Sequence, residues 1–403
     1  MTGAGIVSAL AESWAGDPFD ALPDDHAVAV LVGRVWDPIA EGPSPVVVRG
    51  GSVIDLSRTF PTMRDLCETP DPAQAARDAD GPSLGRIEDI IANTEVSLRD
   101  PAFPTLLAPV DLQALKAAGV TFAASLVERV IEERAAGDQA EAVRIRNVLL
   151  AQGITSDLAD IEPGSDAAGR LKRSLVAEGL WSQYLEVGIG PDAEIFTKGQ
   201  ILSAVGTAVP VGVRRDSSWN NPEPEVALVV QSTGRAIGAT LANDVNLRDI
   251  EGRSALLLGR AKDNNASCAL GPFIRLFDET FGMQDIEMMT VSLEIRGEDG
   301  FTLSARSPMA DISRTPQNLL RQLMGHHHRY PDGAVLMLGT GFAPVDDRGQ
   351  AGAGFTHLTG DIVRISTPSL GSLVNRVLPS DECDPWDYGV GDLMRSLARR
   401  RLL

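Results

Sequence analysis

Three carboxylates in two short segments are the residues of this sequence best suited to chemistry. The segment NPEPEVALVV carries Glu223 and Glu225, and the segment LANDVNLRD carries Asp244. The first segment has the composition of a strand, and side chains two positions apart on a strand point to the same face. The segment continues as an apolar run over residues 226–230, which indicates that the strand is buried. Two like charges beside a buried strand are costly unless a cation neutralises them.

A hard divalent cation such as Mg²⁺ prefers carboxylate oxygens as ligands. The sequence therefore predicts a metal site formed by Glu223, Glu225 and Asp244, in an enzyme whose substrate completes the coordination of the ion. Lys262 follows in the segment AKDNN and can serve as a buried cation, a proton-transfer group or a carboxylate binder. An isolated Glu-x-Glu pair also fits a solvent-exposed edge strand, so the metal assignment depends on the segments that follow.

The elements that must position these residues are of mixed type. Hydrophobic periodicity predicts helices around residues 126–131, 138–150 and 166–178, whereas the chain from residue 186 onward is rich in strand patterns. Gly50-Gly51 is a predicted hairpin turn, and residues 297–300 are a second hairpin connection. Because strands and helices do not alternate regularly, the predicted fold class is α+β.

The length of 403 residues suits two domains. We predict an N-terminal domain over residues 1–112, with short strands at residues 27–56 followed by a small cap and a linker rich in Pro, Asp and Ala. A catalytic domain is predicted over residues 113–403.

The overall composition narrows the classes of partner. The formal net charge of −19 argues against a nucleic-acid partner and against an anionic membrane surface. No apolar run reaches the roughly 18 residues that span a bilayer, and the N-terminal segment lacks the basic region of a secretory signal. The cysteines Cys67, Cys268 and Cys383 are far apart, which predicts reduced thiols in a cytoplasmic protein.

From Ala118 onward the sequence resembles the fumarylacetoacetate hydrolase family, in a set of segments that occur in the family's order. These segments are GVTFAASLVE, EIFTKG, the Glu-x-Glu strand, ANDVNLRD, RAKDNNASCALGP, LGTGFAP and GDIVRISTPSLGSLVNRV. The resemblance implies the family's mixed β-roll catalytic domain with a smaller N-terminal β-rich domain. It implies a divalent metal, Mg²⁺ with Mn²⁺ as a substitute, on Glu223, Glu225 and Asp244. It also implies a homodimer or a dimer of dimers.

The same resemblance points to residues that contact the substrate. Thr340 lies in the loop that would bind the substrate carboxylate, and Phe122, Lys198 and Arg248 lie in matching segments. Lys198 and Arg248 equally fit ion pairs with the acidic cluster. For these two residues substrate binding and structural support therefore both remain open.

One position departs from the family pattern. Hydrolytic members have a histidine as general base where this sequence has Ser125, and the loss of an imidazole weakens the case for hydrolysis of a C–C bond. From about residue 27 onward the sequence resembles the branch of the family that dehydrates 2-keto-3-deoxy-pentonates, the D-xylonate and D-arabinonate derivatives of non-phosphorylating pentose catabolism. The substrate partner would then be a small 2-keto-3-deoxy sugar acid.

For that branch the resemblance implies a Mg²⁺-dependent hydro-lyase whose product is 2-oxoglutarate semialdehyde (2,5-dioxopentanoate). Glu128 and Lys262 are the candidates for proton transfer, with either one as acid or base, and Ser125 would position the leaving hydroxyl or a water. Two alternatives remain: a hydrolase that cleaves a 2,4-diketo acid, and a noncatalytic metal-dependent protein that binds sugar acids. The stereochemistry at the hydroxyl-bearing carbon depends on pocket shape, which the sequence leaves open.

His326, His327 and His328 form a run that invites a metal interpretation. Consecutive side chains on a strand or helix cannot all face one ion. We therefore predict a surface or interface position for these histidines instead of a metal site.

Overall fold

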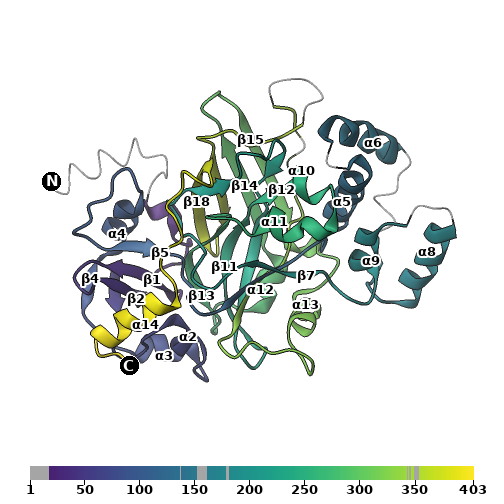
Figure 1. Cartoon of the computed structure of the whole chain (residues 1–403). Helices are drawn as coiled ribbons and strands as arrows, with labels where there is room; N and C mark the ends of the chain where they lie inside the picture. Colours follow the sequence, from purple (N-terminus) through teal and green to yellow (C-terminus); the bar gives the residue numbers. More distant parts are fainter. Residues whose placement is uncertain are drawn as a thin grey trace.

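The computed structural model describes residues 18–136, 138–151, 161–177, 181–342, 344, 346–348 and 354–403. This part of the chain forms two β-sheets with helices around them (Figure 1). The larger sheet has the strand order β4-β3-β2-β1-β13-β11-β10-β16-β6-β7, and β5 pairs with β1. Its strands are β1 (Leu31–Asp37), β2 (Gly42–Arg49), β3 (Ser52–Asp55), β4 (Ser83–Arg86), β5 (Thr105–Leu107), β6 (Ala114–Ala118), β7 (Ile195–Gly199), β10 (Pro224–Val230), β11 (Ala236–Asp244), β13 (Cys268–Leu276) and β16 (Ala334–Met337).

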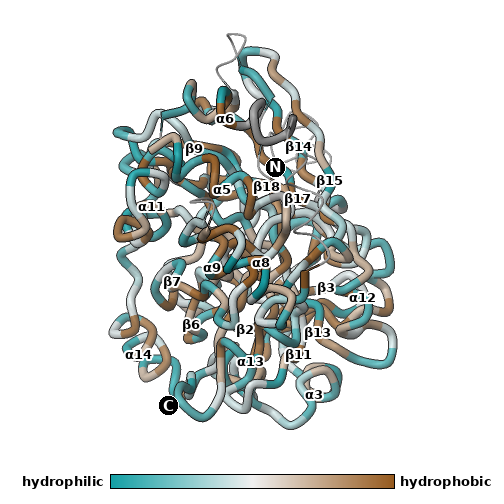
Figure 2. The backbone as a smooth tube through the Cα atoms, turned by 90° about the vertical axis from the view of Figure 1, so that its right-hand side faces the viewer, coloured by the Kyte–Doolittle hydropathy of each residue, from teal (hydrophilic) through white to brown (hydrophobic). Residues whose placement is uncertain are grey.

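The second sheet has the order β15-β14-β17-β18-β8 and contacts the larger sheet through β10, β11 and β13. Its strands are β8 (Val211–Val213), β14 (Thr290–Arg296), β15 (Thr302–Pro308), β17 (Ile362–Thr367) and β18 (Gly371–Pro379). The predicted strands from residue 186 onward are thus confirmed, and so is the mixed α+β fold class. In Figure 2 hydrophobic stretches run through the interior and hydrophilic ones follow the outer loops.

Strand β10 is buried on both faces, which explains its uninterrupted apolar run. Successive side chains of a strand point to opposite sides. Val226, Leu228 and Val230 belong to the core between the two sheets, whereas Ala227 and Val229 belong to the core on the other face of the larger sheet. The strand that leads out of the Glu-x-Glu segment is therefore fixed by packing on both sides.

Helices α5 (Ala123–Ala135), α6 (Gln139–Ala151), α8 (Asp166–Ala177) and α9 (Gln183–Ile189) lie together on one side of the sheets (Figure 1). All three predicted helical segments are confirmed by this group. Apolar residues of the group, including Leu126, Ile131 and Leu185, form a core of their own. The backbone N–H of Glu141 donates to the Asp138 carboxylate at 3.0 Å, so Asp138 caps the start of α6.

The N-terminal strands continue the larger sheet, because β1 pairs antiparallel with β13. The predicted division between residues 112 and 113 stays a prediction beside this shared sheet. The stretch over residues 60–105, predicted as a small cap and a linker, contains α2 (Met63–Cys67), α3 (Pro72–Asp78), β4 and α4 (Ile87–Thr94). Side-chain caps explain two of these helices, since Thr62 accepts from Asp65 N–H and Asp71 accepts from Gln74 N–H.

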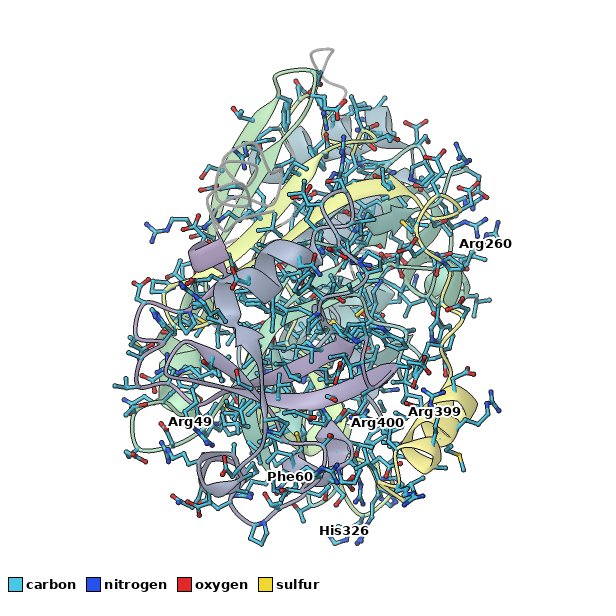
Figure 3. The ribbon with its side chains drawn as sticks, turned by 90° about the vertical axis from the view of Figure 1, so that its left-hand side faces the viewer. Arg49, Phe60, Arg260, His326, Arg399 and Arg400 are labelled. Carbon is cyan, nitrogen blue, oxygen red and sulfur yellow. The ribbon has the colours of Figure 1, made fainter. Side chains whose placement is uncertain are left out.

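The remaining elements are short. They are η1 (Pro18–Ala21), β9 (Asn220–Asn221), β12 (Asn246–Leu247), α10 (Arg248–Glu251), η2 (Ala255–Leu257), α11 (Leu258–Lys262), α12 (Met283–Met288), η3 (Met309–Asp311), α13 (Pro316–Leu323) and α14 (Val390–Arg399). Figure 3 shows α14 beside the N-terminal strands, where Arg400 donates to Pro43 O at 2.6 Å.

Both predicted hairpins form, and Gly50 and Gly51 have the positive φ values that such a tight turn requires. His326 projects from the surface (Figure 3), and all three consecutive histidines are exposed, as predicted. The three cysteines are free and buried. None of the described helices is long and apolar enough to cross a membrane.

Candidate metal centre and active site

The structure brings the three predicted ligand carboxylates together. Glu223 precedes β10, Glu225 lies within it, and Asp244 ends the neighbouring strand β11. The two strands pair antiparallel, with Glu225 opposite Ala242. One carboxylate oxygen from each residue lies within 4.8 Å of the other two, and all three residues are buried. We call these three residues the acidic trio.

Two lysines hold Asp244 and Glu223 in place. Lys262, at the end of α11, places its Nζ 2.5 Å from Glu223 Oε2 and 3.1 Å from Asp244 Oδ2. Lys198, fully buried on β7, places its Nζ 2.8 Å from Asp244 Oδ1. Burial opposes the charge of Asp244, but the two ammonium groups lower the pKa of this carboxyl. Burial likewise opposes the charge of Lys262, yet Asp244 and Glu223 raise its pKa, so the ammonium stays protonated.

Glu225 lacks such compensation. Its Oε2 accepts a hydrogen bond from Gly339 N–H at 2.7 Å, and within the described chain it makes no ion pair with a lysine or arginine. Burial raises the pKa of Glu225 well above its ordinary value, and the charges of Asp244 and Glu223 raise it further. A carboxylate in this position requires either a proton or a nearby cation.

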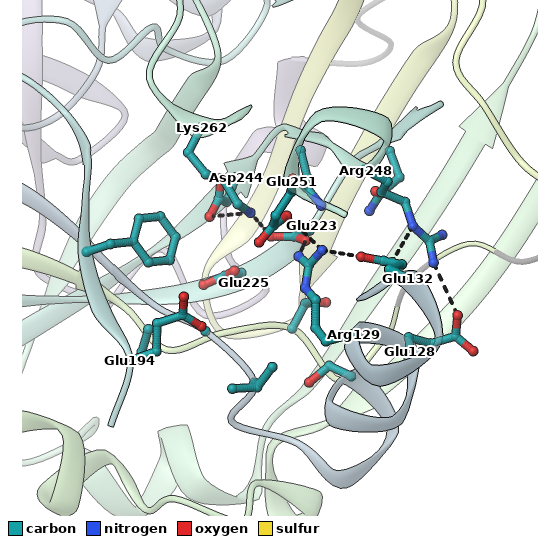
Figure 4. Close-up of a pocket in the computed structure, with 18 residues that line it drawn as sticks. Glu128, Arg129, Glu132, Glu194, Glu223, Glu225, Asp244, Arg248, Glu251 and Lys262 are labelled. Atoms are coloured by element: carbon teal, nitrogen blue, oxygen red, sulfur yellow. Dashed lines mark hydrogen bonds and ion pairs between the residues drawn. The ribbon is translucent and has the colours of Figure 1, made fainter. Parts of the chain in front are cut away.

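Helix α5 reaches the acidic trio through Arg129. The guanidinium lies 2.7 Å from Glu223 Oε1, 2.6 Å from Glu132 Oε2 and 2.7 Å from Glu251 Oε2. These three carboxylates raise the pKa of Arg129 despite its burial. They also share one positive charge, and burial together with Glu223 and Glu132 raises the pKa of Glu251 to about 7. Figure 4 shows Arg129 between the trio and the acids of the helical side.

A second arginine orders the outer part of the cavity. Arg248, at the start of α10, places Nε 2.6 Å from Glu132 Oε1 and Nη2 3.1 Å from Glu128 Oε2. Its guanidinium carbon lies 4.5 Å from the centroid of the Trp219 ring. Arg248 is thus fixed by Glu132, Glu128 and Trp219. Of the two carboxylates, Glu128 is the more exposed one. In Figure 4 Glu128 lies on the opposite side of Arg129 from the trio.

Glu194 lies on the other side of the cavity, close to the trio. It lines the same cavity as Glu225 and Lys262, and Figure 4 shows it below Glu225. Burial raises the pKa of Glu194, and Glu223 and Asp244 add to this effect although Arg129 and Lys262 oppose it. The described chain offers its carboxylate no hydrogen bond or ion pair. Such a group keeps its proton at higher pH than an ordinary glutamate and can donate it.

The other predicted site residues divide into two groups. Ser125 and Thr340 line the cavity, where Ser125 Oγ donates to Phe122 O at 2.9 Å and Thr340 Oγ1 donates to Phe342 O at 2.8 Å. Phe122 and Lys198 do not line it. Phe122 is buried in the core between the sheets, and Lys198 forms an ion pair with Asp244. For these two residues the geometry favours structural support over the predicted contact with substrate.

Four charged residues of the cavity were not predicted from the sequence: Arg129, Glu132, Glu194 and Glu251. Glu132 lies one helical turn after Glu128, and Glu251 lies three residues after Arg248, so helical spacing could have placed both beside a predicted site residue. Glu194 begins the segment EIFTKG, but nothing in its local sequence marks it as buried.

The donor set fits a divalent metal ion. Seven carboxylates and three cationic side chains line the described cavity, so negative charge is in excess. Glu225 in particular has no cationic partner among the described residues, and carboxylate oxygens are the ligands that Mg²⁺ prefers. The fold and site together define an α+β protein with a buried carboxylate centre able to hold a divalent cation.

Comparison with known proteins finds similarity to one family. Residues 186–378 match the model of the fumarylacetoacetate (FAA) hydrolase C-terminal family. It is 32% identical over 186 residues to a 2-dehydro-3-deoxy-D-arabinonate dehydratase of Saccharolobus solfataricus. It is 29% identical over 194 residues to a Haloferax volcanii protein named "Probable 2-keto-3-deoxyxylonate dehydratase". These matches cover 46% and 48% of this chain and 58% and 63% of the relatives, less than two thirds of their length.

Solved structures share the fold. Two structures of 2-keto-3-deoxy-D-arabinonate dehydratase, one apo and one complexed with magnesium and 2,5-dioxopentanoate, each superpose with a TM-score of 0.60 at 19% sequence identity. Each match covers 87% of this chain and 99% of the other. The predicted fumarylacetoacetate-hydrolase-like fold is thereby confirmed.

Proposed function

We propose that this protein is a Mg²⁺-dependent hydro-lyase that converts a 2-keto-3-deoxy-pentonate to 2,5-dioxopentanoate. The observation that carries the proposal is the acidic trio, whose oxygens lie within 4.8 Å of one another while Glu225 lacks a cationic partner in the described chain. The names of the two curated relatives support the dehydratase class and the sugar-acid substrate. The magnesium complex of the structural neighbour supports the choice of metal.

A divalent cation bound by Glu223, Glu225 and Asp244 would bind the carboxylate and keto oxygens of a 2-keto acid and polarise the carbonyl. Lys262 remains protonated between Glu223 and Asp244. Its ammonium is therefore suited to stabilise negative charge that develops on the keto oxygen, and not to remove a proton.

The reaction balances without a further reactant. A proton leaves C3, and the C4–O bond breaks as the hydroxyl gains a proton and departs as water. A second proton then leaves C5 and one returns to C3, which gives the C4–C5 enol. The enol O–H loses its proton and C4 gains one, so that the terminal alcohol becomes an aldehyde. Two proton-transfer groups beside Lys262 are needed, one that accepts from C3 and one that donates to the C4 hydroxyl.

The geometry offers Glu128 and Glu194 for these two tasks. Arg248 Nη2 lies 3.1 Å from Glu128 Oε2, and this contact fixes the position of a carboxylate that lines the cavity, as a general base requires. Burial raises the pKa of Glu194, which suits an acid. We therefore assign the donor role to Glu194 in place of Lys262 and keep Glu128 as the acceptor. Thr340 and Ser125 remain candidates for holding the substrate carboxylate and the departing water.

The test is turnover of both C4 epimers of the 2-keto-3-deoxy-pentonate by the full-length protein. An NADP⁺-dependent semialdehyde dehydrogenase reports the product after treatment with EDTA and again after addition of MgCl₂. We expect product with one epimer, lost with EDTA and restored by Mg²⁺. Formation of pyruvate from a 2,4-diketo acid would favour the hydrolase instead. Sugar-acid binding without turnover of either epimer would favour the noncatalytic alternative.

A further inference from the structure

A second cavity lies between the N-terminal strands and the body of the molecule and shares no lining residue with the first. Its walls come from β1 and β5, from residues 202–209 that follow β7, and from the segment just before α14. Figure 1 shows β1, β5 and α14 at the end of the molecule away from the α5 helical group. Arg34, Arg99 and Asp384 are its charged residues.

Arg34 is buried with part of its hydrogen-bonding capacity unused. Its Nη1 donates to Val110 O at 2.5 Å and, more weakly, to Ala108 O at 3.4 Å. Within the described chain only Nη1 of Arg34 forms hydrogen bonds, although the residue is only 6% exposed. Arg314, another buried arginine without a carboxylate, contrasts with it, since Nε, Nη1 and Nη2 of Arg314 all donate to oxygens.

Arg99 repeats this pattern on the same cavity. Its Nη2 donates to Thr94 O at 2.8 Å, but its Nε is buried without a hydrogen-bond partner. Asp384 lines the same cavity, yet it forms an ion pair with neither arginine in the described chain. Asp111, the other carboxylate near Arg34, is already bonded by the backbone N–H groups of Met63, Arg64 and Leu112. Two guanidinium charges thus face the cavity against one carboxylate.

The rest of the wall is aromatic and aliphatic. Trp36 and Tyr388 meet edge to face, with ring centroids 5.7 Å apart, and Leu106 and Val205 add apolar surface. Buried guanidinium donors without partners favour an anion, and the apolar wall favours a carbon skeleton attached to it. Asp384 disfavours a dianion such as phosphate because of like-charge repulsion.

We propose that this second cavity is a binding site for a small organic monocarboxylate. The carboxylate lies against Arg34 and Arg99, and the carbon skeleton packs on Trp36 and Leu106. Planar guanidinium groups bind carboxylates through paired N–H donors, which matches the unused Nε positions. This site is separate from the acidic trio and does not depend on the proposed function.

The probe is benzoate, titrated calorimetrically into the full-length protein, with benzyl alcohol as its neutral counterpart and inorganic phosphate as an anion without an apolar part. We expect one benzoate site per chain that persists in Glu225→Gln, a variant of the acidic trio. Arg99→Gln should weaken benzoate binding at least about tenfold without changing the weaker binding of benzyl alcohol. Phosphate should bind less tightly than benzoate.

The control is Arg58→Gln, which removes the same charge at an exposed position of the N-terminal segment and should leave benzoate affinity unchanged. Arg34→Gln is a second test, and because Arg34 is buried its fold is checked by circular dichroism first. Arg99 is only half-buried, so the test stands even if Arg34→Gln does not fold. The proposal is overturned if benzoate does not bind, if binding is lost in Glu225→Gln, or if Arg58→Gln weakens it as much as Arg99→Gln.

Discussion

Arg129 Nη2 lies 2.7 Å from Glu223 Oε1, so helix α5 contacts one residue of the acidic trio directly. The trio itself stands on the strands of the larger sheet, whereas Arg129 belongs to a helix with a core of its own. The geometry of the candidate metal centre therefore depends on how the helical group docks against the sheet. Because Arg129 also contacts Glu132 and Glu251, its removal would leave three buried carboxylates without their shared cation.

Arg129→Gln is expected to weaken metal affinity and activity together. Partners that orient metal ligands commonly contribute about 10- to 100-fold in affinity or rate, and we expect a loss in that range. Isothermal titration with Mg²⁺ and the coupled assay measure the two effects. Arg134→Gln, at an exposed position of the same helix, is the matched control. Equal effects of the two substitutions would assign the loss to the helix as a whole instead of to the Arg129–Glu223 contact.

Glu225→Gln is expected to separate metal binding from stability. The amide removes a buried charge whose pKa is raised by burial, Asp244 and Glu223, so the metal-free variant should melt at the same temperature as the parent or higher. Mg²⁺ should then add no thermal stability, and Mg²⁺-dependent turnover should be lost. Melting curves with EDTA and with MgCl₂ or MnCl₂ test this. A rise in the melting temperature of Glu225→Gln on addition of Mg²⁺ would place the metal elsewhere.

The raised pKa of Glu251 predicts how the free energy of unfolding of the metal-free protein depends on pH. Burial, with Glu223 and Glu132, raises its folded-state pKa from 4.5 to about 7. The folded state therefore binds the proton more tightly than the unfolded state. This contribution, about 3 kcal/mol, is complete below the unfolded pKa and is lost as the pH rises through the folded pKa. Urea unfolding in EDTA should show stability falling across this window, and Glu251→Gln should flatten the slope. An unchanged slope would contradict the assignment.

Glu194→Gln is expected to reduce kcat by about 10²- to 10⁴-fold if the carboxyl donates a proton. Since the raised pKa keeps Glu194 protonated to higher pH, wild-type activity should fall on the alkaline side as this proton is lost, and the variant should lack that limb. Glu128→Gln should show a comparable loss in kcat. Full kcat in Glu194→Gln would return the donor role to Lys262.

Gly119→Ala tests the same carboxylate without replacing it. A Cβ at this position would lie 2.1 Å from Glu194 Oε2 and 2.8 Å from its Cδ, so the side chain must move away. We expect kcat to fall while the circular dichroism spectrum is unchanged. In the Glu194→Gln background the substitution should cause little further loss, because both changes act through one group. Additive losses would show that Gly119 affects the reaction by another route.

The sequence predicted the three carboxylates of the strands and two residues of helix α5, Ser125 and Glu128, but it missed Arg129 and Glu132 of the same helix. The Glu-x-Glu spacing followed by an apolar run is a local pattern. It predicts that the side chains of Glu223 and Glu225 lie together, as the structure shows. In the sequence, Arg129 and Glu132 resemble ordinary surface charges of an amphipathic helix. The local sequence does not show which face of the helix packs against a strand more than 90 residues further along the chain. The same limit explains residues 60–105, where side-chain caps and contacts with the larger sheet stabilise helices that periodicity did not reveal.

Strand β10 carries Glu225 and is packed into two cores at once. Its amide hydrogens are therefore expected to exchange with solvent only when the whole molecule opens, and not through local fluctuations. The ligand positions would then keep their spacing until global unfolding. Changes in substrate preference among related proteins would accordingly arise in α5 and at the cavity rim, since a change in β10 would destabilise the fold itself.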